Sequence, residues 1–209
     1  MTENSPESGL QPAVTTSTSN WKRFVLDLLE TLFLSVVLFL AIDAVSARVR
    51  VEGYSMRPTL DDHQYVLISR LAYRLDEPQR GDIIVFRPPM YPQESFFKRF
   101  TGLPDEWEDY IKRVIGLPGE EVRIENGHVY INGEPLDELY ITASPNYMGI
   151  WNVPEGYLFV LGDNRNNSSD SHSWGLLPME NVVGKAILVY WPPLKWNVLN
   201  HDLAAAAAP

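Results

Sequence analysis

The sequence predicts a mainly β protein, made of antiparallel sheets and preceded by one transmembrane helix. Three observations support this prediction. A long apolar run lies near the amino terminus, short β-branched and aromatic runs follow it, and turn residues separate those runs. Because helical periodicity is nearly absent after the first run, the pattern is typical of one β domain behind a membrane anchor.

The composition excludes several classes of function. The 209 residues, 45% of them hydrophobic, suffice for one main domain. A net charge of -10 without a basic stripe argues against nucleic acid as a partner. The chain has no cysteine, which excludes disulfides, thiolate zinc sites and cysteine nucleophiles, and it has only four scattered histidines. We therefore expect neither a metal nor a cofactor.

The amino-terminal region divides into a tail and an anchor. Residues 1–20 are rich in Ser, Thr, Pro and Glu without apolar periodicity, which predicts a disordered tail. Residues 21–47 are predicted to form the membrane anchor. Its apolar part, residues 24–45, reaches roughly 33 Å as a helix, enough to cross a hydrocarbon core of about 30 Å. Its acidic residues lie toward the two ends, within reach of water and headgroups.

Three other readings of this run remain open. It could lie on the membrane as an amphipathic helix or be a buried core helix. It could also be a cleaved export signal, because Val45, Ser46 and Ala47 end it in an Ala-x-Ala-like pattern. The long acidic leader and the length of the run favour a retained anchor. Basic residues flank the run on both sides and leave its orientation undecided.

The β domain is predicted to cover residues 48–196. Its expected strands are residues 65–69, 82–86, 110–116, 121–124, 128–131, 157–161 and 186–191. Asn126 and Gly127 are a strong hairpin signal within residues 120–140. Residues 90–109 form a polar and aromatic insertion, either a loop that dips into the membrane or one that covers the domain edge. Residues 197–209 are predicted to be a frayed tail.

Ser55 is a candidate nucleophile because of its surroundings. Gly53 and Pro58 flank it and argue against a regular helix or a paired central strand. The hydroxyl is then expected on an irregular, exposed bend, where Gly53 leaves room for an approaching chain. Most serines beside a glycine simply form turns, so this pattern alone is weak.

A serine needs a base to attack an amide, because its hydroxyl is a very weak acid at neutral pH. Candidates are the lysines and three histidines, His63, His128 and His172. Lys112 stands out because it lies inside the apolar strand YIKRVIGLP, where alternation could direct it into the domain. Burial would lower its pKa and make it a usable base. The alternative is an outward lysine on a half-exposed strand.

Five segments carry a resemblance to a known family. GYSMRPTL, YVLISRLAY, RGDIIVF, YIKRVIGLPGE and LGDNRNNSSDSHSWGLLP occur in the same order and setting as the motifs of type I signal peptidases. Together with the anchor, the resemblance covers nearly all of residues 21–191. It implies that Ser55 is the nucleophile and Lys112 the general base of a Ser/Lys dyad, a variant of serine catalysis.

The resemblance also implies supporting roles for other residues. Met56 would support the site by packing, and Ser168 would form a hydrogen bond with the lysine and orient it. Polar residues would hold the site together through an ion pair, and they are Asp163, Arg165 and Asp170. Some members carry a serine two residues before the nucleophile, where this chain has Gly53. The oxyanion would then rest on the Ser55 amide with a neighbouring group or water, as in Gram-positive-like and cyanobacterial-like members.

The implied activity is removal of signal peptides from exported precursor proteins after an Ala-x-Ala-like site. Expected partners are these precursors, membrane lipid and the protein translocation machinery. We expect a single-pass protein of the plasma membrane with its catalytic domain on the extracytoplasmic side; the thylakoid membrane is the alternative location. An extended substrate strand points residues -1 and -3 to the same side, so two shallow pockets could select small side chains.

Competing functions come from other classes. The chain could be an inert anchored β domain that binds exported proteins, which an outward Lys112 would favour. It could be a self-cleaving repressor-type Ser/Lys protease, although no DNA-binding head is apparent. A Ser/His/Asp enzyme using His63 or His172 lacks the expected strand context. The run from Asp61 to His63 could bind a metal, although a solvated turn is the commoner outcome.

Overall fold

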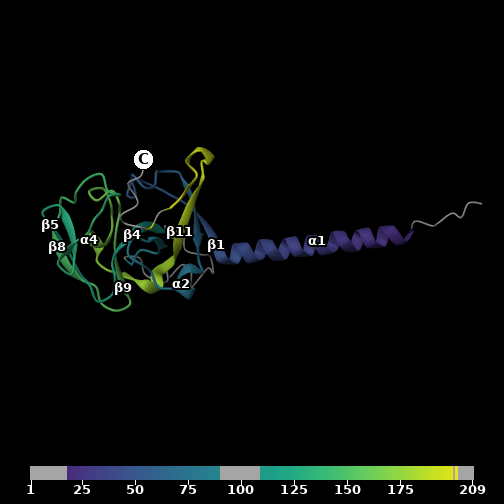
Figure 1. Cartoon of the computed structure of the whole chain (residues 1–209), viewed down its shortest axis with the longest axis horizontal. Coiled ribbons are helices and arrows are strands. Elements are labelled where there is room, and N and C mark those ends of the chain that lie inside the picture. Colours follow the sequence, from purple (N-terminus) through teal and green to yellow (C-terminus); the bar gives the residue numbers. More distant parts are fainter. Residues whose placement is uncertain (1–17, 90–108, 200, 202–209) are drawn as a thin grey trace, which may run out of the picture. The chain divides into compact units, whose positions relative to one another are not determined.

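The computed structural model describes residues 18–89, 109–199 and 201. The chain divides into two compact units, Met1–Ile42 and Asp43–Pro209, which we describe separately (Figure 1). Most of the predicted amino-terminal tail, nearly all of the insertion at 90–109, and most of the carboxy-terminal tail lie outside the described residues.

Helix α1, Thr18–Val45, makes up the described part of the first unit and ends just beyond it. Its segment Trp21–Asp43 is long and apolar enough to cross a membrane, by length and composition, and none of that stretch is buried by protein. Phe33 at 67% exposure and Leu38 at 61% are typical of its apolar side chains. A core helix would bury such residues, so this exposure favours the predicted anchor over that alternative. The helix ends at Val45, and Ser46 and Ala47 begin a strand.

The second unit is built from two antiparallel sheets. The larger one has the strand order β1-β2-β11-β3-β4-β9-β10, with β12 also pairing with β11. Its strands are β1 Ser46–Arg50, β2 Tyr65–Ser69, β3 Ile83–Phe86, β4 Tyr110–Gly116, β9 Tyr157–Leu161, β10 Leu177–Pro178, β11 Val182–Trp191 and β12 Asn197–Val198. The predicted class, mainly β with one amino-terminal apolar helix, is confirmed.

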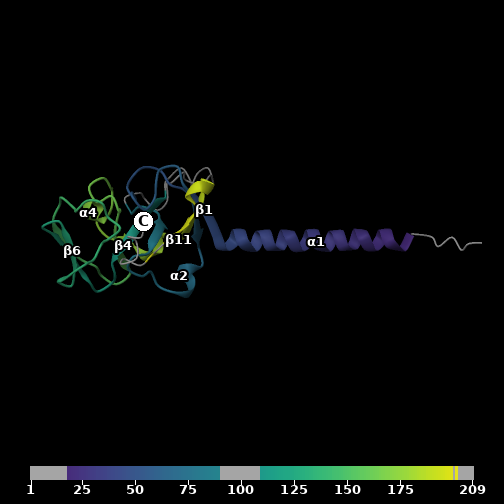
Figure 2. The same ribbon diagram turned by 45° about the horizontal axis from the view of Figure 1, so that its top comes forward.

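The smaller sheet has the order β7-β6-β5-β8. Its strands are β5 Glu121–Glu125, β6 His128–Ile131, β7 Glu134–Pro135 and β8 Gly149–Asn152. Asn126 and Gly127, both at positive φ, form the tight turn between β5 and β6. The short helices of this unit are α2 Ala72–Leu75, α4 Ser171–Trp174, η1 Met179–Asn181 and η2 Pro193–Lys195. In two views, β4 lies between β11 and this smaller sheet (Figures 1 and 2).

Five strands were not predicted: β7, β10 and β12, which have only two residues each, and the longer β1 and β8. β1 has the sequence SARVR, whose arginines suppress the apolar signal, yet it pairs along its whole length with β2, from Ser46 opposite Ser69 to Arg50 opposite Tyr65. β8 has the sequence GIWN and pairs with β5. Both lie at the edges of their sheets, where half of each strand faces solvent and the pattern is less apolar.

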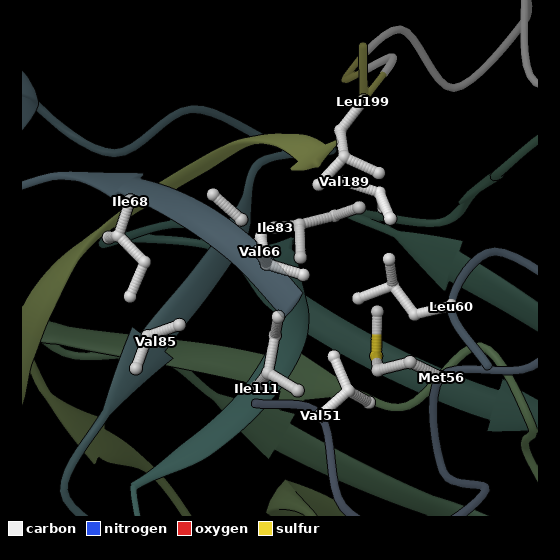
Figure 3. Packing of buried hydrophobic residues seen from close by; sticks show 11 residues of the cluster. Val51, Met56, Leu60, Val66, Ile68, Ile83, Val85, Ile111, Val189 and Leu199 are labelled. Atoms are coloured by element: carbon white, nitrogen blue, oxygen red, sulfur yellow. The ribbon is translucent and has the colours of Figure 1, made fainter. Parts of the chain in front are cut away.

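One apolar cluster positions the candidate site. Met56 and Leu60 from the segment after Ser55 pack with residues of β2, β3 and β11 (Figure 3). Ile111 of β4, the residue before Lys112, belongs to the same cluster. Met56 is 1% exposed and Ile111 is 7% exposed. Because cores are closely packed, these neighbours fix the backbone on both sides of the candidate dyad.

Candidate active site

Ser55 lies on an irregular segment between β1 and β2. The base of this loop is closed by backbone hydrogen bonds between Val51 and Gln64 at 2.7 Å and between His63 and Val51 at 2.9 Å. Gly53 donates its amide to Asp62 Oδ1 at 3.0 Å and has φ +86°, a left-handed conformation that favours glycine. The loop is thus fixed at its base, and Ser55 lies at its partly exposed bend.

Lys112 points from β4 toward this loop. Its Nζ donates a hydrogen bond to Ser55 Oγ at 2.7 Å and another to the carbonyl oxygen of Ile111 at 2.9 Å. The side chain is buried, with 4% exposure. Among the described residues, no carboxylate forms a salt bridge with it. The alternative of an outward lysine is therefore wrong.

Burial lowers the pKa of Lys112 from 10.5 to about 8. The cause is loss of water around the ammonium group, which favours the neutral amine. The negative charges of Asp170 and Asp163 act in the opposite direction and raise the pKa by a smaller amount. A substantial fraction of Lys112 is consequently neutral just above neutral pH, and a neutral amine can accept a proton.

A cleft of about 540 Å³ opens beside the pair. Ser55 and Lys112 both line it, together with Ser169 of the polar loop. One wall comes from β1, and residues at the start of β4 form another part of the lining. The hydroxyl and the amine therefore face a space that can admit a ligand.

The polar loop after β9 contacts the backbone of the Ser55 segment directly. Asn164 donates its amide to the Ser55 carbonyl oxygen at 3.0 Å and its Nδ2 to the Tyr54 carbonyl oxygen at 3.1 Å. Gly162 is so close that a Cβ there would lie 2.5 Å from the Ser55 carbonyl oxygen and would also collide with Ser168. Only glycine permits this approach.

The three charged residues of the polar loop do not pair with one another, and each has a different partner. Asp163 instead accepts from Arg113, at 2.8 Å for Nε to Oδ1 and 2.7 Å for Nη2 to Oδ2. Arg165 pairs with Glu138 at 2.6 and 2.7 Å. Asp170 contacts His172 Nδ1 at 2.6 Å. Asp163 and Arg165 thus have partners outside the motif, whereas Asp170 contacts a histidine within it.

Ser168 also departs from what the resemblance implies. Its Oγ is buried, and it makes no hydrogen bond to any residue that the structure describes. It packs against Gly162, next to the Ser55 carbonyl group. A buried hydroxyl without a partner costs free energy, so this group is available for a further hydrogen bond.

The other candidates have different neighbours. His63 Nδ1 lies 2.8 Å from Arg50 and 3.3 Å from Asp62 Oδ1, and its side chain is 67% exposed. His172 contacts Asp170, and His128 is exposed on β6. The described residues contain no cluster of three or more His, Cys, Asp or Glu that could hold a metal ion.

Sequence reasoning missed the ion pair that underlies the site. Arg113 is fully buried, and its guanidinium also donates to the Gly81 carbonyl oxygen at 2.9 Å and stacks over Tyr140 at 4.1 Å. Thr59 donates to Asp163 Oδ2 at 2.5 Å. The signal that could have found this pair is an arginine next to Lys112 in a strand whose other residues are apolar, since a buried arginine needs a carboxylate.

Comparison with known proteins gives one consistent family. The model of the family described as signal peptidase, peptidase S26 matches residues 25–191. A signal peptidase I of Leptolyngbya laminosa is 45% identical over 78% of this chain and 78% of its own length. A probable signal peptidase I-2 of Synechocystis sp. is 41% identical over 85% of this chain and 78% of its own length.

A further relative comes from a plant. Thylakoidal processing peptidase 1 of Arabidopsis thaliana, a chloroplast protein, is 36% identical over 76% of this chain and 46% of its own length. The residues matched by the family model include the Ser55 loop, β4 and the polar loop after β9. The chain therefore belongs to the signal peptidase family, peptidase S26.

Proposed function

We propose that this membrane-anchored signal peptidase cleaves precursor proteins with Ser55 as nucleophile and Lys112 as general base. The observation that carries the assignment is the 2.7 Å hydrogen bond between a loop hydroxyl and a buried amine whose pKa is lowered to about 8. A general base must lie within hydrogen-bond reach of the proton it removes, with a pKa near the working pH. Lys112 meets both requirements.

The reaction follows from these two groups. Neutral Lys112 takes the Ser55 proton as Oγ attacks the scissile carbonyl carbon, and a tetrahedral oxyanion forms. The lysine then gives that proton to the leaving amine, the C–N bond breaks, and an ester joins the signal peptide to Ser55. Lys112, neutral again, activates water, which hydrolyses the ester and regenerates the serine.

The oxyanion needs hydrogen-bond donors. Within the described part of the chain, the Ser55 amide donates to no acceptor, so it can serve as one donor. Gly53 offers no side-chain donor, and a Cβ there would meet open space. The second donor would then be a neighbouring group or water. The unpartnered Ser168 hydroxyl is suited to orient Lys112, the role that the family resemblance suggests.

The remaining motif residues support the proposed dyad indirectly. Met56 fixes the loop by its burial. Asp163 pairs with Arg113, and Arg165 pairs with Glu138. Arg165 Nε also donates to the Gly162 carbonyl oxygen at 3.1 Å. Together these contacts hold the polar loop against the Ser55 backbone.

The substrate we propose is an extended signal peptide with small residues at positions -1 and -3. Residues of two strands, β1 and β4, line the cleft, which suits a peptide in β conformation. Tethering the enzyme by α1 would raise its effective concentration toward membrane-embedded precursors. We further propose that the β domain lies on the extracytoplasmic side, in contact with lipid and near the translocation machinery.

The test uses the purified full chain in detergent and a precursor bearing an Ala-x-Ala site. Ser55→Ala and Lys112→Ala should each abolish cleavage, whereas His128→Ala, on exposed β6, should leave it unchanged. Thermal unfolding verifies that each variant is folded. Full cleavage by folded Lys112→Ala would assign the base elsewhere, and binding without cleavage by the wild type would favour the binding-module alternative.

A further inference from the structure

His172 follows the polar loop of the candidate site, and the proposed reaction gives it no part. It is in α4, the short helix after the polar loop, and its side chain is only 21% exposed. Its Nδ1 lies 2.6 Å from Asp170 Oδ1, and its backbone amide donates to the same oxygen at 3.2 Å. The imidazole stacks on the Tyr147 ring with centroids 3.9 Å apart and planes 13° apart. The ring is therefore fixed in both position and tilt.

Asp170 connects this histidine to the site. The carboxylate is fully buried, and its second oxygen, Oδ2, accepts the Gly162 amide at 2.9 Å. Gly162 is the residue that closely approaches the Ser55 carbonyl group and Ser168. One carboxylate thus holds the imidazole with one oxygen and the backbone beside the nucleophile with the other.

The charge of Asp170 also acts on Lys112 and favours its protonated form. A hydrogen bond from His172 spreads that charge onto the imidazole and weakens its effect on the lysine. Tyr147, on which the imidazole stacks, is itself acted on by the charges of Arg165 and Glu138 as well as by Asp170. The charges of Arg165 and Glu138 have opposite effects on the pKa of Tyr147.

We propose that His172 is a positioning residue that acts through Asp170: it holds the carboxylate against Gly162 and limits how strongly Asp170 keeps Lys112 protonated. This inference rests on the proposed function of Lys112 as the base. It gives the histidine a role different from that of a triad base, because its ring contacts Asp170 and does not reach Ser55.

Three substitutions separate the contribution of the hydrogen-bond donor from that of the stacked ring. His172→Phe keeps a ring that can stack on Tyr147 but removes the hydrogen-bond donor. His172→Gln keeps a neutral donor without the ring stack. His172→Arg keeps a donor and adds a permanent positive charge beside Asp170. His128→Phe is the matched control, because this histidine is exposed on β6 of the smaller sheet.

The first readout is the pH dependence of kcat/KM for precursor cleavage by the full chain in detergent. Loss of the donor in His172→Phe should move the rising limb to higher pH by about half a unit or more. The limb of His172→Arg should lie at or below that of the wild type, and His172→Gln should lie between Arg and Phe. His128→Phe should match the wild type.

The second readout does not depend on activity. The pKa of Lys112 is measured by NMR in full-length Ser55→Ala protein with labelled lysine, with and without His172→Phe. A higher pKa of Lys112 in the His172→Phe background supports the inference even if the dyad assignment fails. An unchanged pKa together with an unchanged pH limb overturns it, and so does a fall in kcat/KM that has no pH shift and follows only the loss of thermal stability.

Discussion

Lys112 and Arg113 are neighbours on β4 with similar burial and opposite electrostatic surroundings. Arg113 is fully buried, and Asp163 accepts two hydrogen bonds from its guanidinium. Lys112 is 4% exposed, and its two hydrogen bonds go to a hydroxyl and a backbone carbonyl oxygen. Successive residues of a strand face opposite sides, so one strand supplies two environments only a residue apart.

The difference shows how the fold separates stability from reactivity. A buried cation with a bidentate carboxylate stays charged and fixes the parts that it joins, here β4 and the polar loop. A buried cation without such a partner loses its proton more readily. The Asp163–Arg113 pair therefore holds the loop in place, while Lys112 is left with the lowered pKa that a base requires.

The largest effect is expected when residue 112 is made permanently charged, as Arg113 is. Lys112→Arg keeps hydrogen-bond donors but cannot become neutral, because the guanidinium has a pKa above about 12. We expect cleavage to fall by about 1,000-fold or more, measured as kcat/KM on the purified full chain. Activity within tenfold of the wild type would show that a neutral amine at position 112 is not needed.

The next largest effect is expected when Arg113, on the opposite face of β4, loses its charge. Arg113→Met leaves the fully buried Asp163 carboxylate without its cation, which should destabilise the β domain by about 3 to 5 kcal/mol. The measurement is the thermal midpoint of the full chain in detergent. Arg113→Met combined with Asp163→Asn is the matched control, and it should recover a large part of the loss. Equal destabilisation by the single and double variants would mean that the unpaired charge is not the cause.

Comparison of sequence and structure shows why the two neighbours differ in predictability. The motif around Lys112 and the alternation of β4 indicated the lysine, but alternation alone left open whether it pointed inward. An arginine in an apolar strand could have indicated that Arg113 needs a carboxylate. The identity of its partner Asp163, and the Arg165–Glu138 pair, could not be predicted, because each pair joins strands or loops far apart in the chain and depends on tertiary packing. Edge strands β1 and β8 were missed because exposed faces weaken the apolar pattern.

A smaller change in stability, this time a gain, is expected when Lys112 is replaced by an apolar residue. The pKa of Lys112 falls from 10.5 in the unfolded chain to about 8 in the fold, so below pH 8 folding must bury a charged amine. The cost at pH 6 is about 3 kcal/mol. Lys112→Met removes it and should raise the thermal midpoint by several degrees while abolishing cleavage.

The pH dependence of that gain tests its origin. Between pH 8 and 10.5 the unfolded wild type binds more protons at this lysine than the folded protein does, so wild-type stability rises with pH across this window. The advantage of Lys112→Met should therefore be constant below pH 8 and shrink to about 1 kcal/mol at pH 10. The same advantage at pH 6 and pH 10 would mean that packing, and not the charge, limits the wild type.

The smallest effect tests whether the loop conformation at Gly53 matters apart from the charges on β4. A Cβ at this position would meet open space, so a clash is not expected, but φ +86° is strained for any other residue. Gly53→Ala should lower stability by about 1 kcal/mol and reduce kcat more than it changes KM, because the strain shifts the Ser55 amide proposed to bind the oxyanion.

Gly119→Ala is the matched control: it has a similar φ of +81° and equally open space, but it lies in the turn before β5. A similar loss of stability in both variants, with loss of kcat only in Gly53→Ala, would separate the cost of backbone strain from the role of the loop in the reaction. Equal kcat in the two variants would mean that the left-handed turn at Gly53 serves folding alone.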